Sequence, residues 1–253
     1  MLSEPRTIFF QTRLDWPEVP DFRVTRDLVR RLYNKLHESD FETFRYDNIN
    51  LGSVHCDLST HIERSESICR FGDDWMIFIE RHPNFTVDGF LEKIRGVLRA
   101  LHAISEDADG VRFPPFITQR TRVQALSQPQ ILDDSLNLLA GRVANAMESI
   151  DPFGRPPAFF GVRFRFPPCT IEHAAGAEVS HDDFATVRFE TYSEDPQQVW
   201  MECDSFSLFS GELPAVDDSE KIEQQVRSAY RFLTENCKQF LDQFDVSDDE
   251  QHE

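Results

Sequence analysis

The sequence predicts an α+β protein made of two successive halves, each with the element order β-α-β-β-β-α. Three observations lead to this prediction. Short segments with an apolar–polar period of two alternate with longer segments whose apolar residues recur every three or four positions, as in amphipathic helices. The same order of elements occurs before and after the polar loop at residues 105–110. Several strands are joined as hairpins, which favours curved antiparallel sheets backed by helices.

The first half is expected to span residues 1–110 and to begin with a strand at 7–14. This segment is short, apolar and aromatic, and it ends before Trp16 and Pro17. Thr25 then has the position and chemistry of a helix cap. The predicted helix presents one apolar face, which consists of Leu28, Val29, Leu32, Tyr33 and Leu36.

Three more strands and a second helix complete this half. Residues 54–58 alternate as a half-buried strand does. Residues 67–71 and 75–80 flank a Gly-Asp-Asp sequence, which predicts a hairpin. A helix capped near Thr86 follows, and its apolar face consists of Phe90, Ile94, Val97, Leu98 and Leu101.

The second half is expected to span residues 111–244 and to repeat this order. It starts with a strand at 116–126, followed by a helix that Asp133 or Asp134 caps. The apolar face of that helix consists of Leu136, Leu139, Val143 and Met147. In the next strand, four apolar residues predicted to face the core (Phe160, Val162, Phe164 and Phe166) alternate with Gly161, Arg163 and Arg165.

A hairpin of 184–192 and 197–205 and a long helix at about 219–244 close the second half. The inward face of this helix carries Ile222, Val226, Ala229, Leu233, Cys237, Phe240 and Phe244. Residues 245–253 are strongly acidic and lack an apolar run, so we expect a disordered tail.

The strand formed by residues 75–79 before an amphipathic helix, the Arg120-Thr121-Arg122 strand and the closing long helix carry a resemblance. In this order of elements the chain resembles a sporadically distributed bacterial family of uncharacterised proteins of about this length. The similarity covers most of the chain and contains no specific motif. It implies the fold and carries no activity over to these residues.

The chain is strongly acidic, with 45 acidic and 26 basic residues and a formal charge of −19. Binding to a phosphate backbone depends on clustered lysine and arginine, and a large acidic excess repels polyanions. General binding to nucleic acid or to an anionic membrane is therefore not expected. One interpretation is that the negative charge keeps the protein soluble. The other is that the acidic residues form a surface that binds a basic protein partner.

The five cysteines are scattered and form no CxxC pair, so they do not resemble a disulfide framework. The first residues lack the basic start and apolar core of a signal peptide. No uninterrupted apolar stretch approaches the length of a membrane span. These features predict a cytoplasmic protein without membrane segments.

The sequence contains none of the common motifs of nucleotide-binding proteins, hydrolases and zinc peptidases, namely GxGxxG, the phosphate-binding loop, GxSxG and HExxH. We therefore predict no cofactor and identify no catalytic residue. His55 and His61 would lie roughly 20 Å apart on a straight strand, too far to share a metal ion. The loop that contains Glu172, His173, Glu178 and His181 is the better metal candidate, but its composition is also that of a solvated loop, and we predict no metal site.

Five arginines of the second half form the main candidate site: Arg120, Arg122, Arg163, Arg165 and Arg188. In each of their strands the opposite face is mostly apolar, so neighbouring strands would gather the guanidinium groups on one sheet face. One interpretation is a charge ladder neutralised by Glu190, Glu202 and Asp204. The other is a groove that binds a carboxylate, a phosphate or an acidic peptide through bidentate hydrogen bonds.

Two functions follow from these observations. We favour a non-enzymatic binding or protein-interaction protein, because catalytic motifs are missing and the scaffold is repeated. The alternative is a small-molecule-binding protein or enzyme that holds an anionic ligand on the arginine face. A deep, closed cavity at Arg120, Arg163 or Arg165 would favour the alternative, and a flat or salt-bridged face would favour the first.

Overall fold

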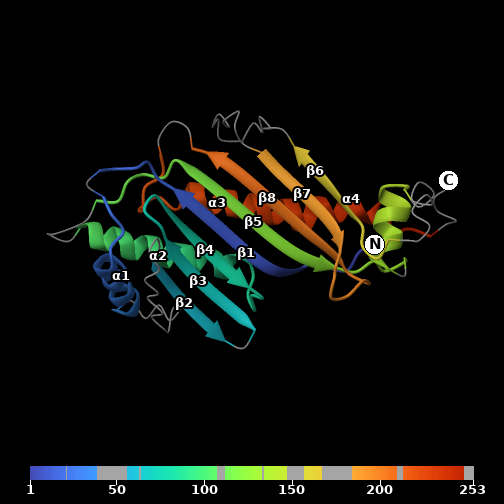
Figure 1. The fold of residues 1–253 in the computed structure, drawn as a ribbon, viewed down its shortest axis with the longest axis horizontal. Coiled ribbons are helices and arrows are strands. Elements are labelled where there is room, and N and C mark those ends of the chain that lie inside the picture. The colour runs from blue at the N-terminus through green and yellow to red at the C-terminus, as the bar shows by residue number, and fades with distance from the viewer. Residues whose placement is uncertain are drawn as a thin grey trace.

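The computed structural model has an α+β fold, in which helices back one face of a curved, eight-stranded antiparallel sheet (Figure 1). The predicted fold class is confirmed at this level. Among the described helices, none combines the length and the apolar character needed to cross a membrane. The structure describes residues 1–20, 22–38, 56–62, 64–106, 112–132, 134–146, 157–166, 184–209 and 213–247.

The elements follow the predicted order. Those of the first half are β1 (Arg6–Asp15), α1 (Arg26–Glu38), β2 (Cys56–Ile62), β3 (Ser65–Phe71), β4 (Trp75–Arg81) and α2 (Val87–Glu106). Those of the second half are β5 (Thr118–Ser127), the π-helix η1 (Asn137–Val143), β6 (Gly161–Phe166), β7 (Phe184–Thr191), β8 (Val199–Leu208), α3 (Glu220–Arg231), the π-helix η3 (Phe232–Cys237) and α4 (Lys238–Asp242).

The strands form one sheet in the order β2-β3-β4-β1-β5-β8-β7-β6. The first strands of the two halves, β1 and β5, pair antiparallel along the middle of this sheet and join the halves. The element order predicted two separate sheets, and this prediction is wrong, because the pairing of β1 with β5 joins all eight strands in one sheet. Counted from the outer edge inward, both halves have the same connectivity, β2-β3-β4-β1 in one and β6-β7-β8-β5 in the other.

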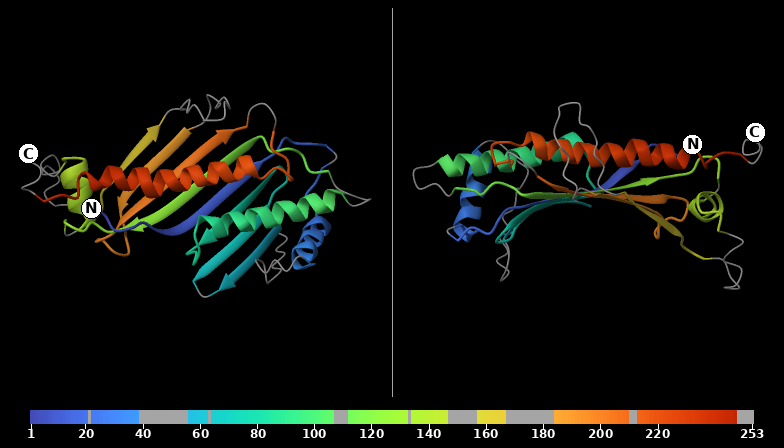
Figure 2. Two further views of the ribbon diagram at one scale, coloured as in Figure 1. Left: turned by 180° about the vertical axis from the view of Figure 1, so that it is seen from behind. Right: turned by 90° about the horizontal axis from the view of Figure 1, so that it is seen from above.

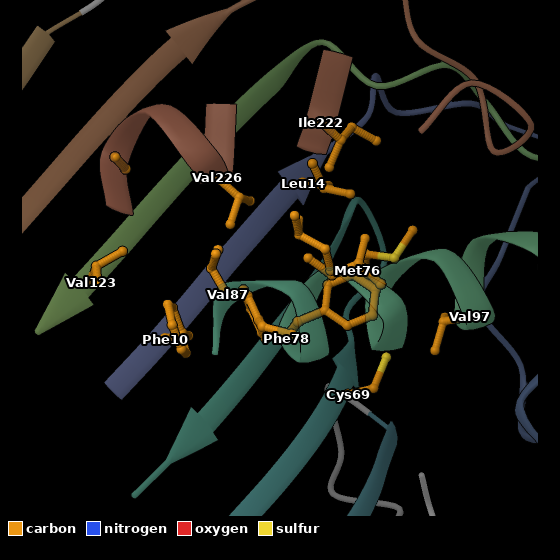
Figure 3. Packing of buried hydrophobic residues seen from close by; sticks show 14 of the residues in the cluster. Phe10, Leu14, Cys69, Met76, Phe78, Val87, Val97, Val123, Ile222 and Val226 are labelled. Carbon is orange, nitrogen blue, oxygen red and sulfur yellow. The ribbon is translucent and has the colours of Figure 1, made fainter. Parts of the chain in front are cut away.

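The core lies between the sheet and the helices α2 and α3. Along β1, Phe10 and Leu14 point toward the helices and are fully buried. They meet Met76 of β4 and Val226 of α3 in one apolar cluster (Figure 3). Figure 2 shows α2 and the continuous α3, η3 and α4 segment on this side of the sheet. Burial of large apolar side chains on one sheet face is what fixes the helices there.

Several local predictions are confirmed. Thr25 caps α1, because its Oγ1 accepts a hydrogen bond from the backbone N–H of Leu28 at 3.2 Å. Asp134 accepts one from the N–H of Asn137 at 2.7 Å at the start of η1. The β3–β4 hairpin closes at Gly72, whose N–H donates to the carbonyl of Trp75.

The predicted helix of the second half is shorter than expected. It forms the seven-residue η1, which ends at Val143, and Met147 of the predicted apolar face lies outside the described residues. Asn145 adopts a positive φ of 47°, a conformation that ends helices. Among the described residues, η1 therefore occupies the position of the 13-residue α1 in the element order, and it is shorter than α1.

Two further expectations are corrected. Phe164 and Phe166 face the helix side as predicted, but both are exposed, because β6 is an edge strand without full helical cover. Asp245, expected in the disordered tail, is fully buried. Its carboxylate accepts hydrogen bonds from the backbone N–H groups of residues 130–132. Burial alone would raise the pKa of Asp245, but these hydrogen bonds outweigh it and lower the pKa.

Candidate functional site: the uncovered sheet face

Among the described elements, none lies over the middle of the sheet face opposite α2 and α3 (Figure 2). We call this the uncovered face. Side chains alternate between the two faces along each strand. The strand register and the burial of each residue therefore show which side chains lie on the uncovered face. Its central residues are Phe9, Gln11, Arg13, Ile77, Ile79, Arg120, Arg122, Gln124, Trp200, Glu202, Asp204, Arg188, Glu190, Arg163 and Arg165.

All five arginines of the candidate site lie on the uncovered face. Arg122 of β5 is opposite Asp204 of β8. Arg188 of β7 is opposite Glu202 on one side and Arg163 on the other. The structure therefore brings the arginine-bearing strands together, and it interleaves acidic residues between them.

Asp204 is the partner of two arginines. Arg120 donates two hydrogen bonds to its carboxylate, from Nε at 2.8 Å and from Nη2 at 2.6 Å. Nη2 of Arg122 donates a third hydrogen bond to the same carboxylate at 3.2 Å. Burial on its own would raise the pKa of Asp204, but the two guanidinium groups outweigh this effect and lower the pKa. The hydrogen bond to Asp204 in turn raises the pKa of Arg120. This is a bidentate, charge-assisted contact of the strong kind.

Glu202 is the second acidic centre, and its side chain is almost fully buried. It accepts a hydrogen bond from Nε2 of Gln124 at 2.7 Å and forms ion pairs with Arg122 at 3.6 Å and Arg188 at 3.4 Å. A buried carboxylate needs such partners, since desolvation of an unpaired charge is costly. Glu202 and Asp204, together with Glu190 beside Arg188, are the three acids of the charge-ladder interpretation, and they pair with Arg120, Arg122 and Arg188.

Arg188 is held on three sides. Its Nη2 donates to Oε1 of Glu190 at 2.5 Å, and its guanidinium lies 5.2 Å from the centre of the Trp200 ring. The hydrogen bond to Glu190 is the main reason that the pKa of Arg188 is raised. The side chain is therefore fixed in place before any ligand arrives.

Arg163 differs from the central arginines. Its side chain is exposed, and within the described part of the chain it has no ion pair or hydrogen-bond partner. It lines an open hollow of about 770 Å³ at the start of β6. The other polar and aromatic side chains around this hollow include Arg188, Glu190, Tyr192, Phe159 and Trp200. The hollow therefore combines an available cation with apolar ring surface.

Other candidate chemistry does not assemble in the described residues. His55 and the loop with Glu172, His173, Glu178 and His181 lie outside these residues. Within them, no group of three or more side chains is arranged to hold a metal ion. Burial raises the pKa of the Cys237 thiol to about 12, so this cysteine is protonated at neutral pH and acts as a core residue.

Two buried polar clusters were missed by sequence reasoning. Glu80 is buried on the helix side and contacts Lys93 of α2 at 2.8 Å and Ser67 of β3 at 2.7 Å. Desolvation raises the pKa of Glu80 despite the charge of Lys93. The sequence contained a signal for this burial, because Glu80 lies two residues after Phe78 and four after Met76. Strand alternation therefore places its side chain on the same buried face of β4. At the centre of the sheet, Oγ1 of Thr12 and Oγ1 of Thr121 lie 2.8 Å apart, which links β1 to β5.

A second hollow, of about 540 Å³, lies between α1 and α2 and contains charges of both signs. Its Arg95 is already paired with Glu223 of α3 through two hydrogen bonds. The uncovered face, where arginines and carboxylates are interleaved, therefore remains the candidate site. Comparison of the chain with models of known protein families and with curated proteins found no match.

Proposed function

We propose that this protein is a non-enzymatic binding protein that docks a protein partner on the uncovered face of its sheet. The observation that carries the proposal is that helices cover one face of the eight-stranded sheet, while the opposite face presents an ordered network of arginines and carboxylates. The arginine site is an open, largely ion-paired surface. That geometry favours an interaction surface over a catalytic pocket.

The composition of the face supports this proposal. Beside the ion pairs lie the half-buried side chains of Ile77, Ile79, Phe9 and Trp200. Protein interfaces are enriched in aromatic residues and arginine, and arginine–carboxylate pairs there provide specificity. Trp75 adds a further ring, with the guanidinium of Arg13 at 4.9 Å from its centre.

The network also reduces the cost of binding. Asp204, Glu202 and Arg188 have their partners in the free protein, so their side chains lose little conformational freedom when a second protein covers them. A partner that adds apolar contacts over Ile77 and Ile79 would gain affinity from buried surface. The charged residues around them would set its orientation.

The experiment compares three baits in affinity capture from the native cells, followed by quantitative mass spectrometry. Ile77→Glu places one negative charge on the uncovered face between Arg13 and Arg70, its neighbours in register. Ser228→Glu adds the same charge at an exposed position of α3. We expect one captured protein to be retained by the wild-type and Ser228→Glu baits. The same protein should be lost from the Ile77→Glu bait. Equal retention by all three baits would contradict it.

The alternative function is binding of a small anionic ligand, and Arg163 is the observation that favours it. This arginine has no ion pair within the described residues, and it lines the aromatic hollow. Millimolar phosphate or citrate at constant ionic strength would then raise the melting temperature of the wild type by binding the folded state. The melting temperature of Arg163→Gln would not respond.

We also propose that the two halves arose by internal duplication. The equal strand orders support this proposal, and so does the matching position of α1 and η1 between the first and second strands of each half. Superposition of residues 1–110 on residues 111–244 tests it. A poor fit of the four equivalent strands would argue for two unrelated halves.

A cytoplasmic location completes the proposal. Cys203 and Cys237 are free thiols buried in the core, where an oxidised state would disturb the packing. Free cysteines fit a reducing compartment. Fractionation of the native cells with detection of the protein tests this location.

A further inference from the structure

The two edges of the sheet differ in how well they are covered. At one edge, Leu58 and Thr60 of β2 are buried, and α1 packs near them. At the other edge, five of the six residues of β6 are exposed. Within the described chain the seven-residue η1 packs near this strand, and η3 and α4 each reach it through one phenylalanine ring. Because both halves have the same strand order, β2 shows what a covered edge looks like in this protein. The β6 edge lacks that cover within the described chain.

The helix side of β6 carries exposed phenyl rings. Phe164 is 37% exposed and contacts Phe189 and Phe240 edge to face. Phe166 is 42% exposed and contacts Phe232 of η3. Each ring is packed on its inner side and open on its outer side. A strand added beyond β6 would place its own side chains against these open sides.

The backbone of β6 is oriented for such an addition. The N–H of Thr191 donates to the carbonyl of Phe160 at 3.0 Å, which makes this pair the first hydrogen-bonded pair of the β6–β7 ladder. Hydrogen-bonded pairs alternate along antiparallel strands, so Val162 and Phe164 bond to β7. The N–H and C=O groups of Gly161 and Arg163 therefore point away from the sheet. No strand of the described chain pairs with this side of β6, and such an edge is a template for another strand.

The charge at this edge defines the partner. The Arg163 side chain lies on the uncovered face and has no ion partner in the described residues. A residue directly opposite Arg163 in an added strand would lie on the same face, and an acidic residue there would form a cross-strand ion pair. The residues before and after it would lie on the helix side, opposite Val162 and Phe164, and apolar residues suit that environment.

We propose that β6 binds an extended segment of a protein partner by strand addition, with an acidic residue opposite Arg163 and apolar residues on both sides of it. The inference rests on the proposed protein-interaction function and specifies the chemistry of one segment of the partner. The hollow at Gly161, lined by Phe159 and Trp200, provides room for a large side chain of the same segment. Main-chain hydrogen bonds provide affinity in this mode, and the side chains provide specificity.

A second copy of the chain does not fit this edge. If two β6 strands paired antiparallel in a register centred on residue 163, 164 or 165, an arginine of one copy would lie opposite an arginine of the other copy. Like charges directly opposite each other destabilise a strand pair. The chain as a whole is also strongly acidic, so two copies repel each other at long range.

The experiment measures fluorescence anisotropy of a fluorescein-labelled seven-residue peptide in which valine and glutamate alternate. The full-length wild type is expected to bind it, and a peptide with lysine in place of glutamate is expected to bind more weakly. Arg163→Glu should weaken binding of the glutamate peptide by about threefold to tenfold and should strengthen binding of the lysine peptide. Arg99→Glu, at an exposed position of α2, makes the same change in net charge far from β6 and should leave the ratio of the two affinities unchanged.

A backbone variant provides the second test. Arg163→Pro removes an N–H that points away from β7, so it leaves the β6–β7 ladder intact and blocks an added strand. Thermal melts check that the variant is folded. Binding of both peptides should be lost. Peptide binding that persists in Arg163→Pro, equal affinities of the two peptides for the wild type, or slow amide exchange at Arg163 in the free protein would each overturn the inference. Ile77→Glu should bind the peptide normally, which separates this test from that of the uncovered face.

Discussion

Arg163 and Arg188 lie directly opposite each other in β6 and β7, yet their surroundings differ. Arg188 is held by Glu190, Glu202 and the ring of Trp200, whereas Arg163 extends into an open hollow without an ion partner in the described residues. One position of this cross-strand pair is thus part of the fixed charge network, and the other is available to a ligand or partner. The difference can be measured in the free protein.

We expect Arg163→Gln to change the free energy of unfolding by less than about 0.5 kcal/mol, or to stabilise slightly, because it removes a repulsion and breaks no described contact. Arg188→Gln should destabilise by about 1 kcal/mol, since it leaves the buried Glu202 with fewer partners. Urea unfolding of both variants checks this pair. An equal loss in the two variants would show that Arg163 is also part of the network.

Asp204→Asn should destabilise the protein at pH 7 by roughly 1–3 kcal/mol, because Arg120 and Arg122 lose their charged partner. The pKa of Asp204 is lowered in the folded state, so its contribution is present above the unfolded value of about 3.9 and is lost as the pH falls through the folded value. The difference between wild type and variant should therefore shrink below about pH 4. Thermal melts across this range test the sign, and a difference that grows on acidification would contradict it.

Lys93→Met should leave Glu80 buried without its cation. It should therefore lower the free energy of unfolding by roughly 3 kcal/mol at pH 8. The pKa of Glu80 is already raised by burial in the wild type, and removal of Lys93 should raise it further. The loss of stability should be small below about pH 4, where protonation of Glu80 is favoured in the folded and in the unfolded protein, and it should increase as the pH rises. Denaturant unfolding at the two pH values measures this change, and a cost independent of pH would argue against an ionised Glu80.

Phe164→Ala should destabilise by about 2 kcal/mol, which is less than the 3–5 kcal/mol expected for a fully buried ring. Phe189→Ala is the matched control, because Phe189 lies on the same side of the adjacent strand and is only 2% exposed. Phe189→Ala should lower the free energy of unfolding by the full 3–5 kcal/mol. If Phe164→Ala were the more damaging of the two, the β6 edge would be covered in solution.

The strands and most of the fold were predictable because their signals are local. The short apolar and aromatic segment at residues 7–14, the Gly72 hairpin and the Thr25 cap are all recognised from neighbouring residues. The joining of the halves depends instead on the pairing of β1 with β5, between residues more than 100 positions apart. Periodicity within a segment carries no information about such a partner.

The candidate site was predictable in part for the same reason. Strand alternation placed Arg120, Arg122 and Arg188 on one face, and the acids named from the sequence are the ones that neutralise them. The isolation of Arg163 and the exposure of Phe164 follow from the edge position of β6, and that position is set by the sheet order. The short η1 was not expected, because the apolar spacing of its residues resembles that of a full helix.

The most direct test of the uncovered face as a docking surface is hydroxyl-radical footprinting of the protein alone and in complex with the captured partner. Trp75 and Trp200 are the reporters for the uncovered face, and Tyr33 of α1 is the reporter for the helix side. Our account predicts that the oxidation of Trp75 and Trp200 falls when the partner binds, while that of Tyr33 stays the same. Protection of Tyr33 with unchanged oxidation of both tryptophans would contradict it.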